Sequence, residues 1–382
     1  MGLIRVLAHL AVNSTRVLIV EAPGHWLTRV ELEQQMALRG WRAAWTPANA
    51  DVLAVCGVPG PELAELAERL WEQMPGPRAR VDVASPAVVG SALEDAATLL
   101  LDTPYHRADA GERAQEPRIP EDHGQMRHEG MDHQGMDHGG HEGMDHGGHG
   151  GHGGMDMAPA GIALAQGGQD RDGLEMDVLH LPLGPVLPFW PAGLVLLCSL
   201  QGDVVVDAVA SVVDGAGQAA SSKEPQNPLV PASAVRCDGV MALLALAGAD
   251  DAAARARRAR DALVRGDQGA ARDAVERLHR TVRRSWLLRW SLRGVLVLDQ
   301  FDLARHDLPE VCRGDAHDRL SSTVERLRSE VCGAAPVPEE TGAVPWETMS
   351  HLVTGLELAT VRLAVASLNL EPVSTVQGVG NA

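Results

Sequence analysis

Cysteine is scarce in this chain, and no two cysteines stand close together. The 382 residues contain five of them, Cys56, Cys198, Cys237, Cys312 and Cys332. They form no CxxC pair and show no even, close spacing. This arrangement argues against a disulfide scaffold, a zinc ribbon and a local iron–sulfur loop.

Long hydrophobic runs are missing too. No segment reaches the roughly 18 uninterrupted apolar residues that a membrane-spanning helix requires, so we expect no membrane span. Residues 1–20 carry Arg5 and lack the sustained apolar run and small-residue cleavage site of a secretory signal. We therefore expect a cytoplasmic protein.

Basic residues are outnumbered by acidic ones, 33 against 51, which gives a net charge of −18. This balance argues against nucleic acid as a partner. Lys223 is the only lysine, and a GC-rich genome explains the preference for Arg as well as function does. The length and the apolar content of 45% predict two or three globular domains.

What the chain does have is a tract of His, Met, Asp, Glu and Gly between His123 and Met157. It holds eight of the sixteen histidines and six of the twelve methionines. Such a composition cannot bury a core, so it predicts a disordered linker, which we place at 108–173. The tract supplies the candidate metal ligands His123, Met126, His128, Met131, Asp132, His133, Met136, Asp137, His138, His141, Met144, Asp145, His146, His149, His152, Met155 and Met157.

Two interpretations of this tract are open. A plain soluble linker needs only Gly and acidic residues, so the histidines and methionines favour binding of a transition metal. Imidazole and carboxylate suit Ni²⁺, Zn²⁺ or Cu²⁺, and thioethers favour Cu(I). Several weak sites on a mobile chain provide capacity and no fixed geometry, which fits storage, delivery or buffering better than catalysis. Because neutral imidazole is the ligand, affinity should fall as the pH drops through ~6.5.

Before the tract, strands alternate with helices, which predicts a small doubly wound α/β domain over 14–107 with a parallel sheet. The expected strands are 16–21, 50–56 and 80–84, and the expected helices are 27–40, 61–73 and 93–101.

After the tract, a β-hairpin followed by helices predicts an α+β domain, mainly helical, over 174–375. The hairpin strands are expected at 194–200 and 204–208, around a turn at 201–203. A polar loop is expected at 221–231, and helices at 240–246, 250–265, 268–293, 323–331 and 346–368.

Two strings in the first domain resemble the small iron–sulfur subunit of respiratory complex I and the NiFe hydrogenases. The string from Pro47 to Gly57 is similar to that family's Arg-Gln-Ala-Asp followed by an apolar strand that ends in glycine. The string Gln73-Met74-Pro75-Gly76-Pro77-Arg78 resembles its Gln-Met-Pro, acid, Pro-Lys/Arg motif.

The second domain resembles the large subunit of the same family, which holds the quinone site in complex I and the nickel site in hydrogenases. Residues 183–194 align without gaps on Gly-Pro-x-His-Pro-x-x-His-Gly-x-Leu, and residues 201–205 match the hairpin Asp-Gly-Glu-x-Val. Residues 354–361 and 366–369 resemble the family's last helix. The resemblance implies a fusion of the two subunits and a protein partner of the oxidoreductase or hydrogenase type.

The departures from the family imply that redox chemistry is lost. A four-iron cluster needs four thiolates, and the first domain has only Cys56, so no iron–sulfur cluster is expected. Leu187 and Pro191 stand where complex I has the two histidines of its quinone hairpin. Thr360 replaces an Asp of the last helix, and the CxxC motifs that hold nickel are missing.

Three functions therefore stay open. The favoured one is an accessory protein, not itself catalytic, whose tract binds a transition metal (Ni, Cu or Zn). The second is a subunit of an NADH:quinone oxidoreductase or hydrogenase-like complex that binds quinone or a redox partner. The third is a structural scaffold.

Other residues each have two interpretations. His25 and Trp26 follow the first strand, where the family has cluster ligands, and we favour a space-filling role for them. Asp299, Asp302, His306 and Asp307 could ligate a metal, but an ordinary polar loop is favoured.

Residues 251–293 contain twelve arginines against five acids. These arginines could form a docking surface for an acidic partner, or they could lie on a solvent-exposed helical face. We favour the solvent-exposed face. Trp286 and Trp290, spaced i, i+4, should lie on one side of a helix, in the core or at an interface.

Overall fold

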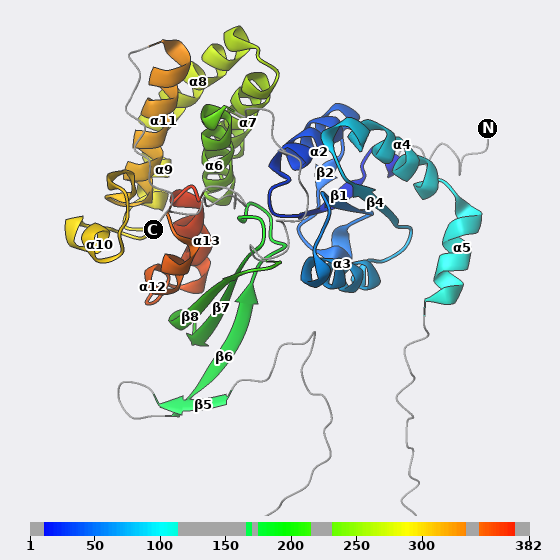
Figure 1. Cartoon of the computed structure of the whole chain (residues 1–382), viewed down its shortest axis with the longest axis horizontal. Coiled ribbons are helices and arrows are strands. Elements are labelled where there is room, and N and C mark those ends of the chain that lie inside the picture. The colour runs from blue at the N-terminus through cyan, green and yellow to red at the C-terminus, as the bar shows by residue number, and fades with distance from the viewer. Residues whose placement is uncertain (1–10, 114–165, 170–174, 215–230, 334–343, 371–382) are drawn as a thin grey trace, which may run out of the picture.

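The computed structural model describes residues 11–113, 166–169, 175–214, 231–333 and 344–370. We call residues 11–113 the first half and the described residues from 166 to 370 the second half. Figure 1 shows the first half as a parallel sheet between helices, in blue and cyan. The second half combines an antiparallel sheet with a group of helices.

The first half is built on a parallel sheet with strand order β2-β1-β3-β4. Its strands are β1 (Arg16–Glu21), β2 (Arg42–Ala43), β3 (Val52–Cys56) and β4 (Ala79–Val83). Every residue of β3 is buried, as expected for a central parallel strand that is covered on both faces. The apolar runs of the sequence therefore located β1, β3 and β4, whereas the two-residue strand β2 was not predicted.

Helices cover both faces of this sheet. They are α2 (Trp26–Arg39), α3 (Pro61–Gln73), α4 (Val89–Leu100) and α5 (Thr103–Glu112), with the short 3-10 turns η1 (Pro47–Asn49) and η2 (Pro86–Val88). Leu32 of α2 and Leu93 of α4 pack on one face of the sheet, and Leu63 of α3 packs on the other. The α/β prediction for the first half is confirmed. Helix α5 was not predicted, and its residues 108–112 lie in the segment expected to be a disordered linker.

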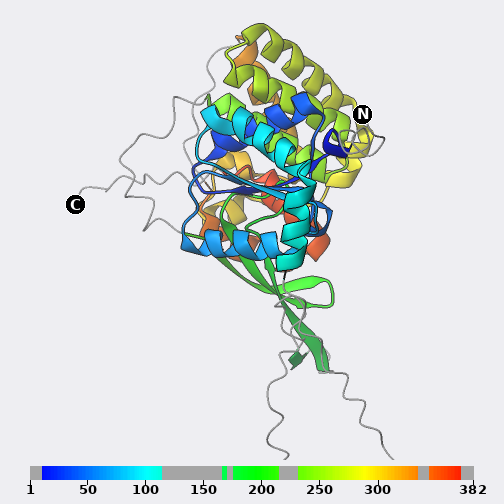
Figure 2. The ribbon, with the colours of Figure 1, turned by 90° about the vertical axis from the view of Figure 1, so that its right-hand side faces the viewer.

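The second half begins with an antiparallel sheet of order β5-β6-β7-β8. Its strands are β5 (Gln166–Gln169), β6 (Glu175–Leu183), β7 (Leu194–Gln201) and β8 (Val204–Val212). Alternate residues of β7 are buried against the helices, so the predicted hairpin is confirmed. β5 and the start of β6 extend beyond the rest of the molecule (Figure 2).

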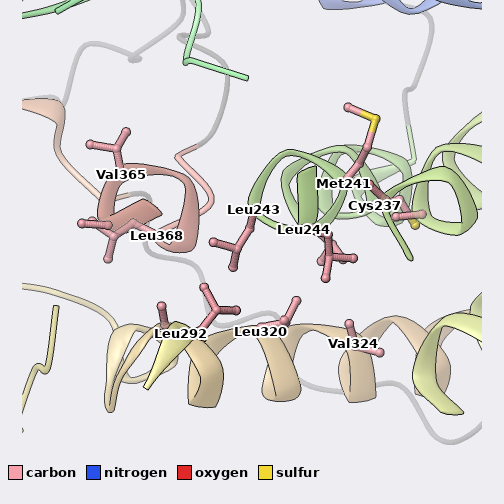
Figure 3. Packing of buried hydrophobic residues seen from close by; sticks show 14 of the residues in the cluster. Cys237, Met241, Leu243, Leu244, Leu292, Leu320, Val324, Val365 and Leu368 are labelled. Atoms are coloured by element: carbon pink, nitrogen blue, oxygen red, sulfur yellow. The ribbon is translucent and has the colours of Figure 1, made fainter. Parts of the chain in front are cut away.

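Helices make up the rest of the second half. They are α6 (Ala232–Leu246), α7 (Asp250–Val264), α8 (Gln268–Arg284), α9 (Trp286–Leu292), α10 (Gln300–Arg305), α11 (Ala316–Cys332), α12 (Met349–Leu352) and α13 (Leu358–Ser367), with the 3-10 turns η5 (Glu310–Cys312) and η6 (Trp346–Thr348). In the core between them, Leu243 and Leu244 of α6 point towards Leu320 of α11 (Figure 3). Met241 points to the opposite side of α6.

Two of the expected helices are interrupted. The helix expected over 268–293 breaks at Ser285, whose backbone is extended and whose hydroxyl accepts a hydrogen bond from Leu288 N at 3.2 Å. The helix expected over 346–368 is broken between α12 and α13, where Gly355 has a φ of 87°. Serine and glycine favour such breaks because one can cap a new helix and the other accepts a positive φ.

Helix α2 belongs to both halves. Its Leu32 and Met36 pack in the core of the parallel sheet, while Trp26 and Val30 are buried in the core of the second half. None of the helices in the described ranges is long and apolar enough to cross a bilayer.

Candidate functional site

A cavity of about 360 Å³ lies where the two halves meet. The first half contributes α2 and β1 to its lining, and the second half contributes the 185–192 loop, α6 and the end of α13. Most of the side chains that line it are apolar, among them Ile19, Met36, Leu187, Phe189 and Met241. The charged residues of the lining are Glu21, Arg29, Glu33, Arg42, Asp238 and Arg257.

The 185–192 loop is fixed by the residues at its ends. Trp190 is buried, and its Nε1 donates to Leu194 O at 2.7 Å. Gly184 has a φ of 93°, and a Cβ there would lie 2.2 Å from Leu194 O, so only glycine fits. Arg362 of α13 donates to Pro188 O and holds the middle of the loop. The loop is thereby held against the cavity.

A buried ionic cluster lies at one side of the cavity and joins the two halves. Arg29 of α2 binds Glu21 at 2.6 Å, Glu33 at 2.7 Å and Asp238 of α6. Arg260 of α7 is fully buried and binds Asp238 at 2.6 Å and Glu33 at 2.7 Å. Arg260 also binds Asp261, the next residue of α7, at 2.8 Å. We call these six residues the ionic cluster.

Asp238 is the central carboxylate of the ionic cluster. It accepts hydrogen bonds from Arg29 and Arg260, and Trp26 Nε1 donates to it at 2.9 Å. Burial alone would raise the pKa of Asp238, but the attraction of the two guanidinium groups outweighs it and holds the pKa well below its ordinary value. Asp238 is therefore ionised at neutral pH.

Glu21 differs from Glu33. Burial raises the pKa of Glu21, and the attraction of Arg29 offsets only part of this effect. For Glu33, burial also raises the pKa, but Arg260 and Arg29 together bring it below its ordinary value. Four carboxylates and two guanidinium groups leave a formal charge of −2. Burial also raises the pKa of Asp261, and the attraction of Arg260 offsets only part of this effect. Glu21 and Asp261 are thus the acids of the cluster with raised pKa values.

This arrangement can bind a molecule with an apolar body and a hydrogen-bond acceptor. The guanidinium groups of Arg29 and Arg260 are occupied by carboxylates. Arg42 and Arg257 also line the cavity, and a guanidinium group is a hydrogen-bond donor. Predominantly apolar walls with a few placed polar groups are typical of small-molecule sites.

The residues predicted from the sequence fall in several places. The seventeen candidate metal ligands between His123 and Met157 lie outside the described residues. Leu187 and Pro191 both line the cavity. Thr360 lies in the first turn of α13, where its Oγ1 donates to Glu357 O at 2.8 Å.

His25 and Trp26 have separate environments. Trp26 is buried and lines the cavity. The ring of His25 covers Gly57, where an added Cβ would lie 2.1 Å from its Cγ. Burial lowers the pKa of His25, so the ring is neutral at pH 7. Trp26 is thus part of the candidate site as well as of the core.

Asp299 and Asp302, two of the four loop residues that the sequence offered as metal ligands, cap a helix instead. Asp299 caps α10 and accepts from Phe301 N and Asp302 N, while Asp302 accepts from Asp299 N. Within the described ranges, the group of His, Cys, Asp or Glu side chains close enough to share a metal ion is Asp315, His317 and Asp318. Asp315 and Asp318 form the capping box of α11, which accounts for their proximity.

The cysteines are dispersed and unpaired. Cys56, Cys198, Cys237 and Cys312 are buried in four different elements, and Cys332 is half-buried. Burial raises the pKa of Cys237 to about 12 and that of Cys312 to about 11. Buried thiols with such pKa values are poor thiolate ligands. The absence of an iron–sulfur cluster remains a prediction.

Sequence reasoning missed the ionic cluster. Its members lie in three separate helices and a strand, so no local spacing brings them together. Two signals were present: Asp238 interrupts an apolar helix between Cys237 and Val240, and Arg260 lies on the alanine side of α7 next to Ala259. A charged residue on an apolar helical face is buried only with a partner.

Comparison of the chain with protein-family models, curated proteins and solved structures finds no match.

Proposed function

We propose that this chain is a binding protein, not itself catalytic, of the complex I and NiFe hydrogenase type, whose two halves together hold a small, mainly apolar molecule. The observation that carries the proposal is the cavity between the halves, with the ionic cluster at one side. A quinone has the matching chemistry, because it combines a flat apolar ring with carbonyl acceptors. Its carbonyl would accept a hydrogen bond from Arg257 or Arg42, which line the cavity.

Such a quinone would be held without being reduced by this chain. Leu187 and Pro191, which line the cavity, have no polar side-chain atom that could bind a head group. Cys56, the nearest sulfur to Glu21 in the sheet register, is buried with a strongly raised pKa. The partner would be an oxidoreductase-type complex. The protein would either deliver the ligand to this complex or keep the ligand from it.

Tryptophan fluorescence can test the binding. Trp26, Trp41 and Trp190 line the cavity, so a short-chain quinone should quench emission with a saturable dependence on its concentration. Ala37→Phe places a ring in the lining from an exposed position on α2. We expect it to weaken binding roughly tenfold or more by exclusion of the ligand.

Ala254→Phe makes the same change at an exposed position on α7 outside the cavity, and should leave binding unchanged. Circular dichroism checks that both variants fold. Quenching that does not saturate, or that both variants weaken equally, would refute the cavity as a quinone site.

A second function, binding of a transition metal by the tract, is favoured by its eight histidines and six methionines. Calorimetric titration of the full chain with Ni²⁺, Cu²⁺ and Zn²⁺ should show several weak sites, all lost when residues 123–157 are replaced by a Gly/Asp segment of equal length. Equal heats from the two proteins would exclude the tract as the metal site. Failure of both the quinone and the metal experiment would favour the scaffold interpretation.

A further inference from the structure

The short helix α9 exposes large apolar side chains. Trp286 and Trp290 are 76% and 74% exposed, and Leu287 is 56% exposed. Leu288 and Leu292, on the other side of the helix, are buried in the core. These tryptophans therefore do not belong to the core, which leaves the interface interpretation of their spacing. Clustered exposed apolar residues mark interaction surfaces.

Arginines flank these apolar side chains in the sequence, and Asp315, which accepts from Gly294 N at 3.0 Å, is an acidic group beside them. From Arg277 to Leu298 the sequence contains six arginines and neither Asp nor Glu, in a chain whose net charge is −18. Four of them, Arg283, Arg284, Arg289 and Arg293, are exposed. In the part of the chain that the structure describes, no carboxylate pairs with these four side chains. We call Trp286, Leu287, Trp290 and these four arginines the α9 surface.

The break at Ser285 produces this surface. Because α8 ends at Arg284 and α9 starts at Trp286, the direction of α9 is independent of the long helix before it. α9 lies beside α11 on the side of the helical region away from the parallel sheet (Figure 1). Val297 and Phe301, which follow in the chain, are also exposed, at 62% and 72%. The cavity and the ionic cluster share no residue with this surface.

We propose that the α9 surface docks the protein on the surface of an anionic phospholipid bilayer. Tryptophan and leucine insert at the level of the lipid head groups, where an indole finds both an apolar and a polar environment. Guanidinium groups bind the head-group phosphates bidentately. An acidic protein is repelled by an anionic surface everywhere except at a basic patch, so charge also fixes the orientation of docking.

A bilayer fits this surface better than an acidic protein does. The two indoles project from a single short helix, and a lipid interface can adapt around them without a preformed pocket. Arg289 lies within α9 between the two tryptophans, and Arg283, Arg284 and Arg293 flank the helix in the sequence.

Flotation of the full chain with vesicles tests the proposal. At low salt, the protein should float with phosphatidylcholine vesicles that contain phosphatidylglycerol, and much less with phosphatidylcholine alone. Arg284→Gln combined with Arg289→Gln should weaken binding roughly 25-fold, because each basic residue near an anionic surface contributes about a fivefold factor. At about 1 M salt, where screening acts within about 3 Å, most of the binding should be lost.

Two further variants separate the proposal from a general charge effect. Trp286→Ser combined with Trp290→Ser keeps the charge and should still weaken vesicle binding roughly tenfold or more. Arg107→Gln combined with Arg258→Gln removes the same charge from exposed positions elsewhere and should have no effect. Absence of flotation at low salt, equal losses in test and control variants, or binding only to an acidic polypeptide would overturn the proposal.

Discussion

Arg260 of α7 and Asp238 of α6 form a buried ion pair, with 2.6 Å between Nη1 and Oδ1. The same guanidinium nitrogen binds Glu33 of α2 at 2.7 Å, so one arginine of the second half holds a carboxylate of each half. Burying charges is costly, and removal of one partner leaves the others unpaired. The contact between the halves therefore depends on complete pairing within the ionic cluster.

Arg260→Met should be strongly destabilising. It keeps much of the side-chain volume but leaves Asp238 and Glu33 with one guanidinium fewer in a buried site, at a cost of about 3–5 kcal/mol. Urea unfolding monitored by circular dichroism measures this cost. Arg258→Met, two residues earlier and exposed, should change stability by less than about 0.5 kcal/mol. Similar costs for the two variants would contradict the assigned role of Arg260.

Asp238→Asn should carry a pH-dependent cost. Because the folded pKa of Asp238 lies well below its ordinary value, its ionisation stabilises the folded state fully above the unfolded pKa of about 3.9. That contribution is lost as the pH falls through the folded pKa. The stability difference between wild type and variant should thus be constant from pH 7 to about pH 5 and shrink below about pH 4. Urea unfolding across this range measures it, and a difference that grows on acidification would contradict the prediction.

Gly57→Ala should destabilise the first half by about 2–4 kcal/mol. Gly57 has a φ of 94°, and its added Cβ would lie 2.1 Å from His25 Cγ, so backbone strain and a steric clash act together. Gly24→Ala is the matched control, because Gly24 has a φ of 84° but nothing lies within 4 Å of its Cβ. The control should cost only about 1–2 kcal/mol.

The clash itself can be isolated with His25→Ala. The double variant with Gly57→Ala should be more stable than the sum of the single effects by about 1 kcal/mol or more. Additive effects in this double-mutant cycle would mean that His25 does not contact Gly57 in solution.

The native protein should react with a thiol reagent mainly at Cys332. The pKa of all five thiols is raised, but Cys56, Cys198, Cys237 and Cys312 are buried and Cys332 is only half-buried, so access of the reagent decides the reaction. Colorimetric titration should release about one equivalent from the native protein and five after unfolding. Rapid release of more than one equivalent without denaturant would show that a buried thiol is accessible.

Much of the fold could be predicted because apolar patterns dominate it. α3 begins and ends at the predicted residues 61 and 73, and β1 spans the predicted residues 16–21. The start of α11 was placed too late, since the capping box at Asp315 and Asp318 was not recognised. The break at Ser285 was missed because apolar residues continue on both sides of it.

The sequence predicted less of the candidate site than of the fold. The resemblance led to Leu187 and Pro191, and both line the cavity. The opposing charges come from residues as far apart as Glu33 and Arg260, and only tertiary packing shows that they meet. The exposure of Trp286 and Trp290 was equally hidden, because an i, i+4 spacing fits a core as well as a surface.

The burial of helix α2 in both halves affects how this polypeptide folds. Since Trp26 is buried by the second half while Leu32 is buried by the parallel sheet, the first half synthesised alone would expose an indole and leave Arg29 without Asp238. Folding of the amino-terminal part should thus be completed only after the ribosome has released α6 and α7. Co-expression of the two halves as separate polypeptides should yield a stable heterodimer, whereas either one alone should aggregate.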